Sequence, residues 1–127
     1  MSAELRLQWA LDGEPQVRSF VNLAKTPGGG SHVAGLQRGL GALARVLALE
    51  RPEEIAQLLG RYVVAVVSVL HFRPTFAGPT RDRLEAPEIE PLVAGAVEAC
   101  LMEFAQSRPE EARALVTWVT ERDRRGW

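Results

Sequence analysis

Three consecutive glycines precede a helical pattern in the segment TPGGGSHVAGL, residues 26–36, and a glycine-rich turn in this position can bind phosphate. Backbone amides at the first turn of a helix point outwards and attract anions. A nucleotide-binding loop of this type also needs a lysine after its last glycine, whereas here Ser31 and His32 follow. We therefore predict that the glycines serve mainly to let the backbone adopt positive φ between a strand and a helix.

A second candidate for chemistry is the segment RPTFAGPTRDRLEAP, residues 73–87, which combines prolines with charged side chains. It carries three arginines, Arg73, Arg81 and Arg83. Long loops inside a compact domain are often functional, and guanidinium groups bind phosphate, so contact with a phosphate, a nucleotide or DNA is one interpretation. The alternative is a solvated loop in which these charges pair with Asp82 and Glu85.

The remaining reactive side chains predict no metal site and no nucleophile. His32 lies in the first turn of a predicted helix and His71 follows a predicted strand, and neither has a histidine or cysteine partner at ligand spacing. We expect both to have structural hydrogen-bonding roles. Cys100, the only cysteine, lies among apolar helix residues and is predicted to be an inert thiol in the core.

Composition limits the class of protein. A chain of 127 residues with 46% hydrophobic residues can form one globular domain with a core. The net charge of −1 excludes a wholly basic surface for DNA, so any such contact needs a local arginine cluster. A single cysteine excludes an internal disulfide. No signal peptide and no run of about 18 apolar residues occurs, so we expect a cytoplasmic protein without a membrane segment.

The elements that position these residues begin with two strands. Apolar and polar residues alternate over residues 4–11 and again over residues 17–22, the pattern of half-buried strands. Asp12 and Gly13 are turn residues, so we predict a hairpin between the two strands. The apolar run of residues 62–72 predicts a central strand that is buried on both faces.

Helices are predicted in four places. Residues 31–47 have helical periodicity, with Ser31 as the N-cap and with glycines that suggest close packing against another backbone. A short helix over residues 51–59 follows, and two more cover residues 88–106 and 107–125, the last opening with a capping box. That capping box is formed by Ser107 and Glu110. The order of elements predicts an α+β fold with a mixed sheet covered by helices on one side.

Two motifs in this sequence resemble a known family. The stretch around SFVNLAKTPGGGSHVAGL is similar to S-F-V-N-N-I-N-T-x-E-G-G-T-H-x-x-G-F, a motif of the second, or transducer, domain of the ATPase subunit of type IIA DNA topoisomerases, the B subunit of DNA gyrase above all. The matching residues are Ser19, Phe20, Val21, Asn22, Thr26, Gly29, Gly30, Ser31, His32 and Gly35, with serine for threonine at Ser31. The segment FAGPTRDRLEAPEI resembles F-x-x-Q-T-K-x-K-L-x-x-x-E-V, and the likeness covers nearly the whole chain.

The resemblance implies a specific fold and function. The fold is a β-α-β arrangement with a left-handed crossover, similar to domain 2 of a ribosomal protein. The function is to couple ATP binding and hydrolysis in a neighbouring domain to movement of a DNA clamp and strand passage. By position, Arg81 and Thr80 correspond to the residues that contact the γ-phosphate of ATP. Arg83 takes the place of a second lysine, and Pro79 replaces the glutamine.

The resemblance also defines what else is needed. Residues 1–127 correspond to a single transducer domain, with no ATP-binding domain and no cleavage domain. ATP and magnesium would be bound by a neighbouring domain of the GHKL type, so the partners are that ATPase domain or gyrase subunits. DNA contact would be indirect or through a local arginine cluster such as Arg73 and Arg83. The chain alone is expected to hydrolyse nothing.

A second interpretation of the function stays open. Pro79 and the altered stretch 57–63 before the central strand depart from the family pattern. A free-standing, degenerate member of the family could keep the fold, lose the link to ATP and act as a protein-binding or regulatory module. Such a module would have no ATPase activity.

Overall fold

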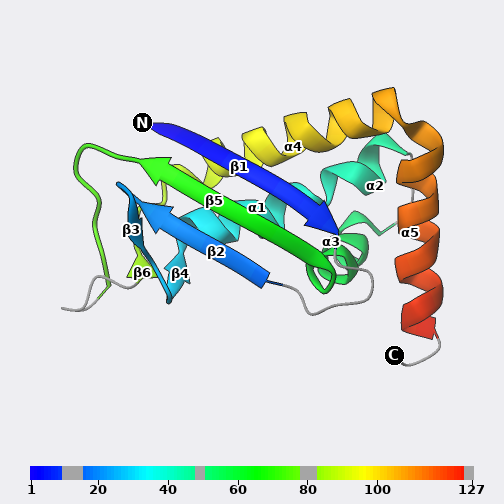
Figure 1. The fold of residues 1–127 in the computed structure, drawn as a ribbon, viewed down its shortest axis with the longest axis horizontal. Coiled ribbons are helices and arrows are strands. Elements are labelled where there is room, and N and C mark those ends of the chain that lie inside the picture. Colours follow the sequence, from blue (N-terminus) through cyan, green and yellow to red (C-terminus); the bar gives the residue numbers. More distant parts are fainter. Residues whose placement is uncertain (10–15, 48–50, 78–82, 125–127) are drawn as a thin grey trace.

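The computed structural model describes residues 1–9, 16–47, 51–77 and 83–124, and a four-stranded mixed sheet forms one of its two layers (Figure 1). The strands are β1 (Ser2–Trp9), β2 (Gln16–Val21), β3 (Ala24–Lys25) and β5 (Val63–Leu70), in the order β1-β5-β2-β3. β5 is antiparallel to β1 and parallel to β2, so the predicted central strand does lie inside the sheet.

The predicted hairpin between the first two strands is wrong. β1 and β2 both pair with β5 and do not pair with each other. With the helices behind the sheet, as in Figure 1, and with β2 and β5 pointing upwards, the chain moves rightwards from β2 to β5. This is a left-handed crossover, which opposes the usual right-handed rule and confirms the fold that the family resemblance implied.

Only one face of β5 is buried, which corrects the prediction of burial on both faces. Its residues alternate between the two sides, so Val63, Ala65, Val67 and Val69 are buried while Val66 and Leu70 are exposed. Strands of a parallel sheet that is covered on both sides are apolar throughout. The apolar run of β5 has the same composition, although only one of its faces is covered. The sheet therefore has one layer of helices and one open face.

The helical layer contains α1 (Ser31–Leu40), α2 (Ala42–Val46), α3 (Pro52–Gly60), α4 (Ile89–Ser107) and α5 (Pro109–Arg124). The single helix predicted for residues 31–47 is divided at Gly41 into α1 and α2. Gly35 and Gly39 lie against α4, where a Cβ on either residue would come within 3 Å of Val93 or Val97. The prediction that these two glycines mark a close helix contact is confirmed.

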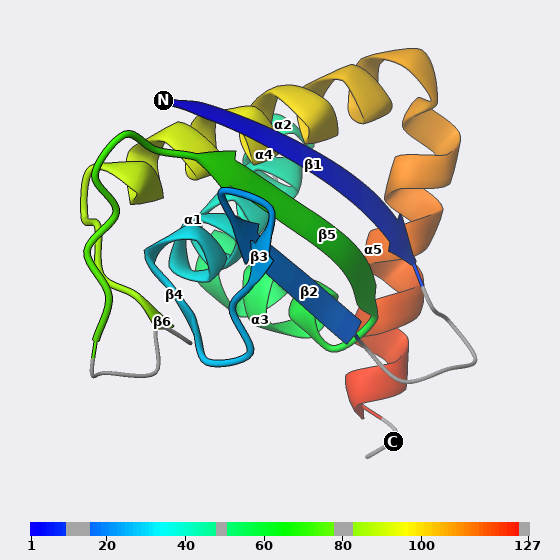
Figure 2. The same cartoon turned by 60° about the vertical axis from the view of Figure 1, so that its left-hand side comes forward.

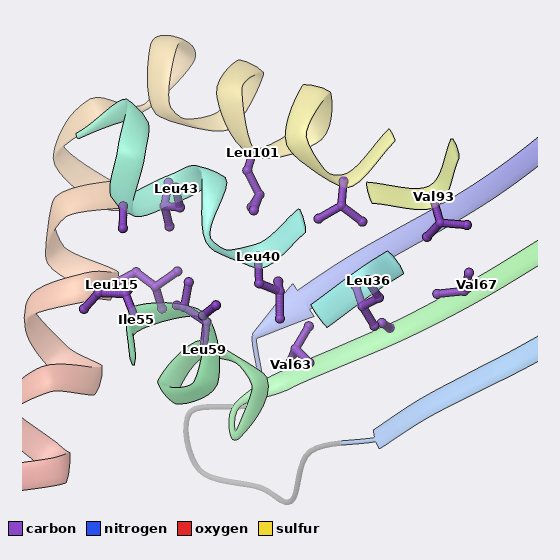
Figure 3. Close-up of a cluster of buried hydrophobic side chains, with 14 of the residues drawn as sticks. Leu36, Leu40, Leu43, Ile55, Leu59, Val63, Val67, Val93, Leu101 and Leu115 are labelled. Carbon is purple, nitrogen blue, oxygen red and sulfur yellow. The ribbon is translucent and has the colours of Figure 1, made fainter. Parts of the chain in front are cut away.

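The core lies between the sheet and the helices. Figure 3 shows side chains from α1, α2, α3 and α4 gathered with Val63 and Val67 of β5, and Leu115 of α5 beside Ile55 of α3. Fully or almost fully buried members include Leu36, Leu40, Leu43, Leu59, Val63, Val67, Val93 and Leu101. Burying a leucine or valine side chain contributes about 1.5–3 kcal/mol, so this layer is the main source of stability.

Two predictions about the C-terminal helices are wrong. Ser107 is the last residue of α4 and α5 begins at Pro109, so Ser107 and Glu110 do not form the expected capping box. Cys100 is exposed on α4 and is not in the core. The buried stripe of that helix follows Val93, Val97, Leu101 and Ala105, and position 100 lies outside it.

Candidate functional site

The structure brings the glycine turn and the arginine-rich segment together in a second, two-stranded sheet. β4 (Gly29–Gly30) is parallel to β6 (Arg83–Leu84), with Gly29 opposite Arg83 and Gly30 opposite Leu84. The two pairs are more than fifty residues apart in sequence, and Figure 2 shows β4 and β6 side by side next to α1. These two candidate segments therefore form one site.

The glycines of this turn have the backbone angles that were predicted. Gly29 has φ of 71° and Gly30 has φ of 126°. A Cβ on Gly30 would overlap the backbone of Leu84. Glycine is thus required at Gly30 both for its conformation and for the pairing of β4 with β6.

Hydrogen bonds hold together the two ends of the segment that carries the predicted phosphate contacts. The Ala77 N–H donates to the Arg83 carbonyl at 2.9 Å, and the Glu85 N–H donates to the Thr75 carbonyl at 2.6 Å. Phe76 and Leu84 form an antiparallel bridge between these bonds. Pro79, Thr80 and Arg81 follow Ala77 and lie outside the described residues.

Arg83 and Arg73 occupy different surroundings. The Arg83 guanidinium donates to the Gly28 carbonyl at 3.2 Å, which ties the arginine-rich segment to the glycine turn. The Arg73 N–H donates to Nδ1 of His71 at 3.0 Å. A phosphate or DNA contact by either side chain stays a prediction.

Three of the signature residues form a buried hydrogen-bonded chain that sequence reasoning had not connected. The Ser19 hydroxyl lies 2.9 Å from the Thr26 carbonyl and 2.7 Å from Oγ1 of Thr26. Oγ1 of Thr26 lies 2.9 Å from Nε2 of His32. All three side chains are buried, so their spacing in the signature motif reflects a polar network inside the fold.

Proton counting assigns the tautomer of His32. A hydroxyl has one proton, and that of Ser19 donates to the Thr26 carbonyl. The Thr26 hydroxyl then donates to Ser19, so Nε2 of His32 must donate to Thr26. Nδ1 is left as a buried acceptor without a partner among the described residues. Desolvation by burial lowers the pKa of His32 from 6.5 to about 4, so the ring is neutral.

Asn22 extends the pairing of β2 with β5 by one residue. Its side chain accepts from the His71 N–H and donates to the His71 carbonyl, both at 2.9 Å. Asn22 has φ of 49°, a conformation that asparagine tolerates better than most residues. At this position of the signature motif, the asparagine side chain makes the two hydrogen bonds that the backbone of a neighbouring strand would otherwise make.

The His71 ring continues this arrangement towards α4. Because Nδ1 accepts from Arg73, Nε2 carries the proton and donates to Glu88 at 2.8 Å. A hydrogen bond from the Glu88 N–H, followed by the bond from His71, lowers the pKa of the Glu88 carboxyl. Every polar atom of His71 thus has a partner within the fold.

Ser31 does not cap α1 as predicted. Gly30 is the N-cap residue, and the Ser31 hydroxyl instead accepts from the Ala86 N–H at 2.9 Å and lies 3.4 Å from the Leu84 carbonyl. The hydroxyl therefore connects the start of α1 to the end of the arginine-rich segment.

Replacing this hydroxyl should have a modest effect on stability. In Ser31→Ala the part-buried Ala86 N–H loses its acceptor, so we expect the free energy of unfolding to fall by about 1 kcal/mol. Ser31→Thr, which restores the family residue and keeps the hydroxyl, should stay within about 0.5 kcal/mol of the parent. Urea denaturation of the three proteins measures both values, and equal losses for both variants would contradict the role of the hydroxyl.

The contacts of this site within the described residues are hydrogen bonds and strand pairing. Among them, no three histidine, cysteine, aspartate or glutamate side chains gather in a way that could hold a metal ion. Within the same part of the chain, no helix has the length and apolarity to cross a membrane. The arrangement is a hydrogen-bonded junction between β2, α1 and the arginine-rich segment.

Solved structures with a similar architecture include ATP-binding regions and B subunits of type II topoisomerases. The fold matches the Francisella tularensis topoisomerase IV ATP-binding domain with a TM-score of 0.76 and 26% identity, over 94% of this chain and 34% of that one. It matches the B-subunit of the Myxococcus xanthus DNA gyrase with a TM-score of 0.74 and 28% identity, over 91% of this chain and 38% of that one.

The sequence comparisons agree with the structural ones. Residues 1–126 match the DNA gyrase B family, and the chain belongs to it. The B subunit of DNA topoisomerase 4 from Bartonella bacilliformis is 31% identical over 96% of this chain and 19% of its own length. The B subunit of DNA gyrase from Campylobacter jejuni is 33% identical over 77% of this chain and 14% of its own length. The chain thus spans less than a fifth of the length of these two relatives.

Proposed function

We propose that this chain is the transducer segment of a gyrase-like topoisomerase B subunit. In this role it couples ATP binding and hydrolysis in a neighbouring GHKL-type domain to movement of a DNA clamp. Its partners are that ATPase domain and other gyrase subunits, and its place of action is the cytoplasm. ATP and magnesium are bound by the neighbouring domain.

The observation that carries this proposal is the anchoring of the arginine-rich segment at both ends. A backbone hydrogen bond joins Ala77 to Arg83, and β6 pairs with the glycine turn. That turn leads directly into α1. α1 in turn packs closely on α4 through Gly35 and Gly39. A force on residues 78–82 therefore reaches two helices of the core through short, hydrogen-bonded connections.

Arg81 is the residue proposed to contact the γ-phosphate, with Thr80 beside it in sequence. A guanidinium keeps the positive charge of the family lysine and can donate to two phosphate oxygens. The likeness to the ATPase regions of topoisomerases supports this role, because the Francisella tularensis relative is described as an ATP-binding domain.

A chimaera tests the proposal. This chain replaces the matching third of the Francisella tularensis topoisomerase IV ATP-binding fragment, and steady-state ATP turnover is measured. Arg81→Ala should lower kcat about tenfold or more, because the variant loses the positively charged side chain that contacts the phosphoryl group during transfer. Arg81→Lys should keep most of the turnover.

The control is Arg113→Ala, which removes an exposed arginine from α5, away from the site. This variant should turn over ATP at the rate of the parent chimaera. Equal turnover by Arg81→Ala and the parent would contradict the phosphate contact. That result would favour the alternative function, a protein-binding module that has lost its link to ATP.

A further inference from the structure

A groove lies along the outer edge of β2, next to the glycine turn. It has a volume of about 540 Å³ and is lined by residues 17–20 and 25–29, together with Val33. Its walls are β2, the chain from β3 into the glycine turn, and the first turn of α1. We call this feature the β2 groove.

β3 covers only one end of the outer edge of β2. The two strands pair at Phe20 and Val21, and Figure 1 shows β3 beside the arrowhead of β2. The Thr26 N–H adds one more hydrogen bond, to the Ser19 carbonyl at 2.9 Å. The next residue is Pro27, which has no N–H to donate. The pairing between β3 and β2 therefore stops at Ser19, and the β2 groove continues the line of β3.

Val17 presents backbone hydrogen-bonding groups to this groove. The backbone groups of residues two apart in a strand point to the same side. Because the Ser19 carbonyl points towards β3, the N–H and the carbonyl of Val17 also point outwards, away from β5. No strand in the described part of the chain pairs with them there. An extended chain in the groove can accept from this N–H and donate to this carbonyl.

Two cations flank the groove on the open face of the sheet. Arg18 pairs with the exposed Val66, and Lys25 pairs with Phe20, two residues from Arg18, so both cations lie on this face. Both side chains are exposed, and neither takes part in an ion pair within the described residues. None of the described residues that line the groove is acidic. The charge of this face is therefore complementary to an anion.

On the helical face the groove is apolar. Val17 packs against the hydrophobic core, and Val33 and Pro27 also line the groove. A chain that pairs with β2 would thus meet cations on one face and apolar side chains on the other.

We propose that the β2 groove binds an extended segment of a partner protein in which acidic and apolar residues alternate. The segment lies antiparallel to β2 and continues the line of β3. The residue opposite Val17 exchanges two backbone hydrogen bonds with it and directs an apolar side chain towards Val33. The residue opposite Arg18 is acidic, because its side chain lies beside both Arg18 and Lys25. Backbone bonds of this kind supply affinity, and the alternating side chains supply specificity.

This binding is independent of the proposed contact with ATP, because Thr80 and Arg81 take no part in it. Its occupant is recognised by an edge strand and two cations that belong to β2 and β3 alone.

Nuclear magnetic resonance of the ¹⁵N-labelled chain tests the proposal, with the acetylated and amidated peptide Val-Glu-Val-Glu-Val as the probe. Titration should give saturable shifts centred on the amides of Val17 and Ser19. At saturation the Val17 amide should exchange with solvent about tenfold more slowly, because it has gained a hydrogen bond.

Charge reversal tests the recognition of the acidic residues. Arg18→Glu/Lys25→Glu should bind this peptide about tenfold more weakly than the parent, and should bind Val-Lys-Val-Lys-Val more tightly than the parent does. Both side chains are exposed, so the circular dichroism spectrum should not change. The control is Arg113→Glu, which reverses an exposed charge on α5 and should bind as the parent does.

Four results would overturn the proposal. The first is a parent chain whose groove amides do not respond to the peptide. The second is equal affinity of the parent and of Arg18→Glu/Lys25→Glu. The third is equal affinity for Val-Val-Val-Glu-Glu, which has the same composition without the alternation. The fourth is the same set of shifts with inorganic phosphate, which would indicate a simple anion site, or with rising protein concentration alone, which would indicate a second copy of the chain.

Discussion

Gly30→Ala is expected to lower the free energy of unfolding by about 3 kcal/mol or more. Gly30 has φ of 126° and ψ of −151°, a region of backbone conformation that is essentially restricted to glycine. The new Cβ would also overlap the backbone of Leu84. The variant must therefore separate β4 from β6 or change the angles of the turn, and either change also weakens the anchoring of the arginine-rich segment.

Gly95→Ala is the matched control for this prediction. Gly95 is exposed on α4, and a Cβ there would meet nothing within 4 Å. Alanine is the better helix former, so this variant should gain about 0.5–1 kcal/mol. Urea denaturation of both variants measures the difference. A loss below about 1 kcal/mol in Gly30→Ala would contradict the tight pairing of β4 with β6.

The glycine turn shows which features of the site could be predicted from the sequence and which could not. The positive φ of Gly29 and Gly30 was predictable because three glycines before a helix have few other uses. Their neighbour, β6, was not predictable, because it consists of two residues and has no periodicity. Arg83 and Leu84 form a strand because they pair with Gly29 and Gly30, which are more than fifty residues away in the sequence. The link between the two candidate segments therefore required the structure.

The order of the strands in the sheet was a second feature that the sequence pattern did not predict. The alternating pattern of β1 and β2 correctly predicts that one face of each is half-buried, but it does not determine which strand lies beside which. Two polar-apolar strands joined by Asp12 and Gly13 looked like a hairpin, whereas the most apolar strand, β5, lies between them. The left-handed crossover came from the family resemblance and not from any pattern in the residues.

Cys100 shows that apolar composition is weaker evidence of burial than helical spacing. α4 is apolar nearly all round, and this favoured a buried thiol. The spacing of Val93, Val97 and Leu101 by four residues already defines the buried stripe, and it leaves position 100 on the outside. The family, the α+β class and the close glycine contacts of α1 were predicted correctly, because each depends on several residues in a fixed spacing.

The stability of this protein is expected to fall by about 3 kcal/mol between neutral pH and pH 4 through His32 alone. Burial lowers the pKa of His32 from 6.5 to about 4, so the unfolded chain binds a proton at a higher pH than the folded one. The stabilisation of the folded state that comes from the neutral His32 ring is fully present above pH 6.5. It is lost progressively as the pH falls towards 4, where the folded protein also becomes protonated.

The hydrogen-bonded chain explains why the charged form is so unfavourable. A protonated His32 would carry an N–H on Nδ1, which is buried and has no acceptor among the described residues. Its other nitrogen already donates to Thr26, whose hydroxyl in turn donates to Ser19. Protonation thus adds a buried charge and turns an acceptor without a partner into a donor without a partner, which is the more costly of the two states.

His32→Gln separates this effect from all other titrations. A glutamine amide at this position can donate to Oγ1 of Thr26 as Nε2 does, but it does not titrate. His71 and every carboxylate remain in both proteins, so the difference between their two stability curves isolates His32. Urea midpoints measured from pH 7 to pH 4.5 should fall more steeply for the parent than for His32→Gln. Parallel curves would show that His32 is not the buried neutral base that the Ser19–Thr26–His32 network requires.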